Sequence, residues 1–204
     1  MKYLTCKAWP LMVLMSLLLG GCATTSPIVS SGNTTYGDSQ AVETLTNEFG
    51  STDLQTIAEA MAGSLLNTPL MATGQRPLVT VADVKNRTSE YIDTKSITES
   101  IRTKLLRSGR VRFAVDKDAM QNQVDELVRQ NQTGLYKHGK AVKMGQMEGA
   151  DYRLEGSISS IVKRADSIKD VYYKFSLVLI NNESGVLEWA DEKEIRKTSV
   201  KSLF

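Results

Sequence analysis

Residues 78–115 read LVTVADVKNRTSEYIDTKSITESIRTKLLRSGRVRFAV and change from a strand pattern to a helix pattern and back. Residues 78–84 are apolar on nearly both faces, which is typical of an internal strand. Residues 96–108 carry a helical stripe of Ile97, Ile101 and Leu105, and Gly109 follows as the C-cap. Residues 111–115 form a second strand. A strand, a helix and a strand in this order predict a parallel pair joined by a right-handed crossover.

Further helices are expected on both sides of this unit. TDLQ, residues 52–55, resembles a capping box, and the helix that follows ends at residues 67–69. Its buried face would be Leu54, Ile57, Ala58, Met61 and Leu65. Asp116 is placed to cap another helix. That helix would carry the apolar residues Met120, Val124, Leu127 and Val128. We also expect a short strand at residues 42–46 and a short helix at residues 141–148.

The end of the chain has the two-residue period of strands. Apolar and polar side chains alternate over residues 152–162 and 171–179, and the run VLEWADEKEI, residues 186–195, supplies a last strand. Turns at residues 164–169 and 182–185 join these segments into an antiparallel meander. The expected fold is therefore α/β, more strictly α+β, with a single mixed sheet of about five strands packed with helices.

The N-terminus has the features of an export signal. A basic start precedes the apolar run LMVLMSLLLGG, residues 11–21, which is too short to span a bilayer. LGGC, residues 19–22, resembles a lipobox, so we expect Cys22 to become the lipid-bearing N-terminus with palmitate-type acyl chains. Ala23 follows Cys22 and favours the outer membrane. We predict a signal peptide at 1–21, a lipidated flexible tether at 22–45 and a periplasmic globular domain at 46–204.

The composition argues against several classes of function. The 25 Lys and Arg lose Lys2 and Lys7 on cleavage, which leaves 23 against 23 Asp and Glu, so phosphate-driven binding of nucleic acid is not expected. His138 is the single His, and Cys22 would be acylated, so we expect no metal and no cofactor. SIVK, residues 160–163, matches an SxxK pattern, but on a strand its Ser and Lys point to opposite faces. We therefore predict that the protein is not an enzyme.

Two groups of polar residues remain as candidate sites. Asn86, Arg87 and Thr88 directly follow the buried strand, where an active-site loop is one alternative. The other, which we favour, is a structural loop in which Asn and Thr bond the local backbone and Asp93 or Thr94 caps the next helix. The second group is basic. A solvated rim is the simpler interpretation, and the alternative is a surface that binds a protein partner, because Arg is enriched at interfaces. Its members are Arg107, Arg110, Arg112, Lys163 and Arg164.

Three stretches resemble the LpoB family of penicillin-binding protein activators. They are residues 84–113, GADYRLEGSI at residues 149–158, and VYYKFSLVLINNESGVLEWADEKEIRK at residues 171–197. The resemblance implies a fold similar to the N-terminal domain of TolB. It also implies an outer-membrane lipoprotein that binds a class A bifunctional penicillin-binding protein and activates peptidoglycan synthesis. Asn86, Arg87, Thr88 and Asp93 match the family pattern, and nothing in that match makes them catalytic.

One departure from the family leaves a second function open. The tether has no long Pro-rich segment, and about 18 to 25 extended residues reach roughly 60 to 85 Å at ~3.4 Å each. The alternative function is an outer-membrane accessory lipoprotein in envelope assembly or secretion, for which a short tether is long enough. Lengthening the tether separates the two functions, because it should help only an activator that must reach an inner-membrane partner.

Overall fold

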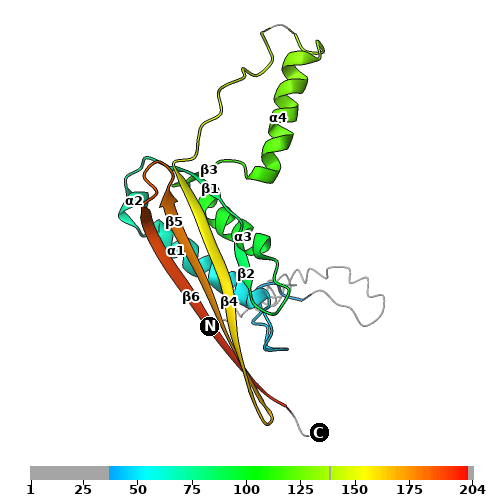
Figure 1. The fold of residues 1–204 in the computed structure, drawn as a ribbon, viewed down its shortest axis with the longest axis vertical. Helices are drawn as coiled ribbons and strands as arrows, with labels where there is room; N and C mark the ends of the chain where they lie inside the picture. The colour runs from blue at the N-terminus through cyan, green and yellow to red at the C-terminus, as the bar shows by residue number, and fades with distance from the viewer. Residues whose placement is uncertain (1–36, 138, 202–204) are drawn as a thin grey trace, which may run out of the picture. The chain divides into compact units, whose positions relative to one another are not determined.

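The computed structural model describes residues 37–137 and 139–201. From residue 39 onward the described chain forms one compact unit, and residues 37 and 38 belong to the unit before it. Figure 1 shows helices packed against one long, twisted sheet. The predicted signal peptide, Cys22 and most of the predicted tether lie outside the described residues. Residues 39–46 form no helix or strand.

One mixed sheet organises the fold, with strand order β3-β1-β4-β5-β6 and β2 paired to β4. The strands are β1 (Leu78–Val81), β2 (Lys85–Arg87), β3 (Arg112–Phe113), β4 (Tyr152–Ala165), β5 (Ile168–Asn181) and β6 (Leu187–Val200). The predicted parallel pair is confirmed, since Leu78 pairs with Arg112 and Val79 with Phe113. The predicted meander is confirmed as well, because β4, β5 and β6 are antiparallel neighbours. The sheet has six strands where about five were expected.

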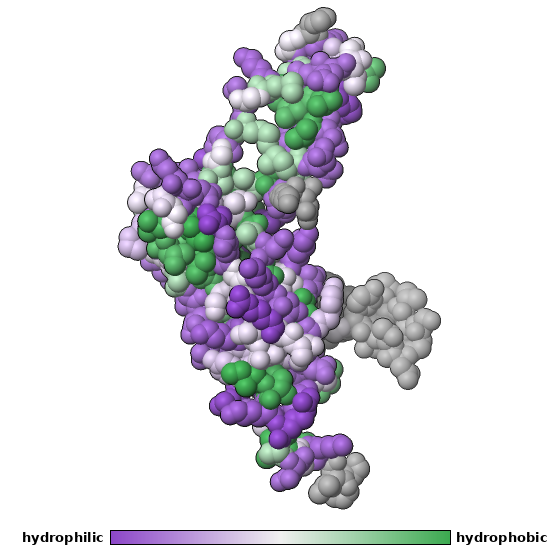
Figure 2. Space-filling model, in the orientation of Figure 1, coloured by the Kyte–Doolittle hydropathy of each residue, from purple (hydrophilic) through white to green (hydrophobic). Residues whose placement is uncertain are grey.

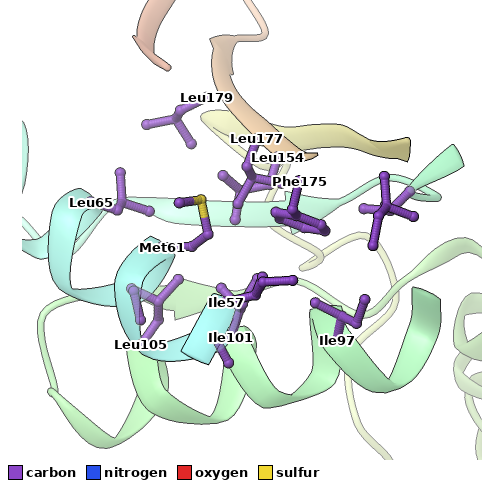
Figure 3. Packing of buried hydrophobic residues seen from close by; sticks show 14 of the residues in the cluster. Ile57, Met61, Leu65, Ile97, Ile101, Leu105, Leu154, Phe175, Leu177 and Leu179 are labelled. Carbon is purple, nitrogen blue, oxygen red and sulfur yellow. The ribbon is translucent and has the colours of Figure 1, made fainter. Parts of the chain in front are cut away.

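Two helices cover one face of the sheet. They are α1 (Ser51–Leu66) and α3 (Thr94–Arg107), and the short α2 (Pro69–Ala72) follows α1. In Figure 3 the labelled side chains of α1 and α3 point toward one another and toward the sheet. Every second residue of β5 joins this core, because strand side chains alternate between faces. The β5 residues in this core are Val171, Tyr173, Phe175, Leu177 and Leu179, and Ile180 is buried as well.

The last strand is held to the first helix by charge. The Lys197 ammonium lies 2.5 Å from a carboxylate oxygen of Asp53, and both side chains are largely buried. Asp53 also accepts a hydrogen bond from the Gly50 N–H at 2.8 Å. The predicted capping box of Thr52 and Gln55 is therefore wrong, because α1 begins earlier, with Gly50 as its N-cap and Asp53 as the residue that bonds back to it. The same carboxylate both starts α1 and anchors β6.

Close contact between β4 and β5 requires a glycine. A Cβ placed on Gly156 would lie 2.4 Å from the Ser176 carbonyl oxygen and 3.0 Å from Leu177. Backbone oxygen cannot move aside as a flexible side chain can. Gly156 therefore fixes the spacing of the two strands at the middle of the sheet.

Two predicted elements are wrong. Residues 42–46 form no strand, because their polar groups serve the start of α1: Glu43 accepts from Ser51 N–H and donates its own N–H to Thr52. Residues 141–148 form no helix. The Val142 backbone bonds instead to the side chains of α4 (Lys117–Gln132), and Gly145 has φ +76, outside the helical region.

The apolar stripe of α4 is only partly buried. Asp116 caps this helix as predicted, accepting from the Ala119 N–H at 2.9 Å. Leu127 is buried, but Val124 and Val128 are 40% and 37% exposed. Apolar residues on one face of a helix are therefore not all part of the core here.

Candidate functional site

The loop after β1 is built by local hydrogen bonds. The Asn86 amide donates to the Glu90 carbonyl at 2.9 Å, and its oxygen accepts from the N–H and the hydroxyl of Thr88. Asp93 caps α3, as predicted, by accepting from the backbone N–H groups of Lys95 and Ser96. One correction is needed, because Asn86 and Arg87 lie in β2, parallel to β4, rather than in a turn.

A buried polar network, missed by the sequence interpretation, holds this loop. The Tyr173 hydroxyl lies 2.7 Å from both carboxylate oxygens of Glu90 and 3.3 Å from the Asn47 carbonyl. Glu90 also accepts from the Phe49 N–H at 3.0 Å, and the Phe49 ring meets Tyr173 edge-on. Burial, and then the bond to Glu90, raise the pKa of Tyr173. The signal in the sequence was Tyr at an inward-facing strand position, because a buried phenol needs a partner.

The three candidate arginines lie at one end of the sheet. Arg110 donates from Nε to the Met71 carbonyl at 3.1 Å, and Arg112 donates to the Arg76 carbonyl at 3.2 Å. Arg112 also forms an ion pair with Glu148 at 2.7 Å. Arg107 is exposed, and within residues 37–137 and 139–201 no side-chain partner is found for it. We call the surface of Arg107, Arg110 and Arg112 the arginine end, and Arg107 is its member most available to a partner.

Lys163 and Arg164 lie at the opposite end. They are near the end of β4. The arginines lie beside its start instead, because Asp151, just before β4, bonds to Leu78, and Leu78 pairs with Arg112. Twelve strand residues at ~3.3 Å each separate the two groups by about 40 Å. The five basic candidates therefore form two surfaces rather than one.

A cavity of about 320 Å³ lies between the end of β1, α3 and Asp116. Within the described residues, the Arg102 Nε is buried without a hydrogen-bond partner, and its guanidinium is 3.5 Å from Asp116. The other charged residues of the lining are Asp83, Lys95 and Glu99. The hydroxyl residues of the lining are Thr80, Thr94 and Thr98, and the Thr98 hydroxyl is held by the Thr94 and Lys95 carbonyls. The described part of the chain also has no cluster of His, Cys, Asp and Glu that could hold a metal ion.

A family model and several solved structures show what the chain is similar to. A family model described as "Peptidoglycan-synthase activator LpoB" matches residues 53–195. The chain is similar to the LpoB C-terminal domain from Escherichia coli, with 19% identity over 70% of this chain and 98% of that chain and a TM-score of 0.45. It is also similar to lipoprotein GNA1162 from Neisseria meningitidis, with 15% identity over 60% of this chain and 84% of that chain and a TM-score of 0.40. No curated protein matches the chain. None of the helices in the described residues is long and apolar enough to cross a bilayer.

Proposed function

Because the chain belongs to the family of LpoB peptidoglycan-synthase activators, we propose that it binds a class A bifunctional penicillin-binding protein and stimulates peptidoglycan synthesis. The observation that carries this proposal is the family match, which covers most of the folded unit, from α1 to β6. Activation would then come from contact with the synthase.

We place the synthase contact at the arginine end. Arg107 presents a guanidinium that the described residues leave without a side-chain partner, and Arg112 lies on the neighbouring strand β3. Arginine suits an interface because its planar fork binds carboxylates with two hydrogen bonds. Arg110 serves the fold, since its bond to the Met71 carbonyl links the end of α3 to α2. It is therefore a poor choice for testing binding.

The proposal includes the lipid anchor at Cys22, in the outer membrane. A flexible chain of about 25 residues has a relaxed span of only roughly 25 to 30 Å, against about 85 Å fully extended. This short span favours the second candidate function, an accessory lipoprotein in envelope assembly or secretion. A longer tether should increase the activity of a synthase activator in cells and leave that of an accessory protein unchanged.

The direct test is the glycosyltransferase rate of a purified class A synthase with the chain added. We expect wild-type protein to raise the rate, and Arg107→Glu to weaken the stimulation most at low salt, because charges at an interface rim act chiefly on association rates. Lys140→Glu, on the exposed loop after α4, is the matched control for a reversed charge. The free energy of unfolding of both variants should lie within about 0.5 kcal/mol of the wild-type value. Absence of stimulation by wild type would favour the accessory function, and equal stimulation by Arg107→Glu would remove Arg107 from the contact.

A further inference from the structure

The far end of the β4–β5 hairpin and of β6 carries exposed aliphatic side chains. We call residues 161–170 and 198–201 the hairpin end. Ile168 lies between Ala165 and Val200 in one cross-strand row, and Ile161 lies on the same face. Ile161, Ile168 and Val200 are 58%, 46% and 69% exposed. Figure 2 shows hydrophobic residues among hydrophilic ones at this lower end of the sheet.

Basic side chains surround these aliphatic residues. The hairpin end holds Lys163, Arg164, Lys169 and Lys201 against Asp166 and Asp170, a net charge of +2. Asp170 is already engaged by Arg196, at 3.5 Å, and by the Thr198 hydroxyl. Lys and Arg can lay their methylene stems on an apolar surface while their charges remain in water. The hairpin end is therefore both apolar and basic.

The chain enters the domain beside this end. The Asn47 amide donates to the Lys169 carbonyl at 3.1 Å and to the Ser199 hydroxyl at 2.9 Å. The Lys197 ammonium donates to the Glu48 carbonyl at 2.7 Å. Asn47 is only 25 residues after Cys22. An anchor at Cys22 would therefore hold the domain by the side on which the hairpin end lies.

We propose that the hairpin end docks on a membrane surface rich in anionic phospholipid, with its aliphatic side chains at the headgroup boundary and its basic side chains on the phosphates. The proposal rests on the lipid anchor of the proposed function. Aliphatic side chains flanked by Lys and Arg suit such a surface. The aromatic residues that dominate protein hot spots are missing from the hairpin end, as its sequence shows.

Docking at this end would also orient the domain. The arginine end lies about 40 Å away along the sheet, by the strand rise of ~3.3 Å per residue. The synthase contact would then point away from the membrane that holds the anchor. The length of the folded domain would extend the reach of the short tether.

The test uses the mature chain, residues 22–204, with Cys22→Ser so that no lipid is attached. Binding is measured by cosedimentation with vesicles of phosphatidylethanolamine and phosphatidylglycerol, and with neutral phosphatidylcholine vesicles. We expect binding to the anionic vesicles only. Lys163→Gln with Arg164→Gln should weaken it about 25-fold, since each basic residue near an anionic surface contributes about five-fold. Ile168→Ser with Val200→Ser should weaken it several-fold at every salt concentration.

Lys140→Gln with Lys143→Gln is the matched control, because it removes two charges from an exposed loop elsewhere. This double variant should bind the anionic vesicles as tightly as wild type does. The proposal is overturned if wild type ignores the anionic vesicles, if the control weakens binding as much, or if the Ile168 and Val200 changes have no effect. Loss of synthase stimulation in detergent by the Lys163 and Arg164 variant would instead identify a protein contact. Synthase stimulation by the unlipidated wild type needs no vesicles, so it tests the proposed function separately.

Discussion

Replacing Tyr173 with Phe should destabilise the domain without changing its shape. The change removes one oxygen atom from a residue that is fully buried. That hydroxyl donates to the Glu90 carboxylate at 2.7 Å, and a hydrogen bond to a charged group contributes about 1.5 to 3 kcal/mol. Glu90 keeps the Phe49 N–H as a donor, so the loss should stay within this range. For a domain of this size it corresponds to a fall in melting temperature of about 3 to 12 °C.

Urea denaturation and thermal melts followed by circular dichroism measure this loss. Tyr172→Phe is the matched control, because Tyr172 is the neighbouring residue, lies on the opposite face and is not in the core. It should cost less than about 0.5 kcal/mol. If Tyr173→Phe cost as little as the control, the Glu90 network would not hold the loop, and our account of it would be wrong.

The same residue predicts how stability changes in alkali. Burial and the bond to Glu90 raise the pKa of Tyr173 above the usual 10.0. Above pH 10 the unfolded phenol loses its proton while the folded one keeps it, so the unfolded state binds fewer protons. The contribution of Tyr173 to the free energy of unfolding should therefore be fully present below pH 10. Above pH 10 it should fall by at most about 1.4 kcal/mol per pH unit. Tyr173→Phe should show a shallower decline.

Three other predictions concern separate parts of the chain. Asn86→Ala should cost about 0.5 to 1.5 kcal/mol in thermal melts, because it removes local bonds around β2; a variant that melts like wild type but loses activity in cells would make the loop a binding site. Gly156→Ala should cost about 1 to 3 kcal/mol in urea denaturation, because its Cβ would meet the Ser176 carbonyl oxygen at 2.4 Å; Gly149→Ala, where the added Cβ meets nothing, is the control. Mass spectrometry of the mature N-terminus should find acylated Cys22 in the outer-membrane fraction, and an unmodified or soluble protein would exclude the anchor.

Periodic sequence predicted the core of the fold well. The apolar stripe of α3 and the alternation along β5 are set by local geometry, so the buried face follows from the residues themselves. Residues 42–46 and 141–148 were misassigned because short apolar patterns do not show where the backbone groups find partners. In both segments side chains of a neighbouring helix, 9 and 11 positions away along the chain, supply those partners. Likewise, α4 has the pattern of a core helix but is left half exposed.

The candidate site was harder to predict. The local role of Asp93 follows from its position before a helix, and the structure confirms it. The grouping of the basic residues depends instead on the length and direction of β4. Arg112 and Lys163 are both near strand ends, but at opposite ends of the sheet. The Tyr173–Glu90 bond joins residues 83 positions apart, and only the fold brings such residues together.

The central position of β4 has a consequence for the order of folding. Its pairs with β1 and β2 join segments far apart along the chain, whereas the β4–β5 and β5–β6 hairpins are closed by short turns. Long-range parallel pairing requires a large loop closure and is slow, while hairpins form early. The N-terminal half has no central strand to pair with until β4 has been made. We therefore expect the last third of the chain to form the nucleus, with α1 and α3 docking on it afterwards, so that removing β6 would harm folding more than removing residues before α1.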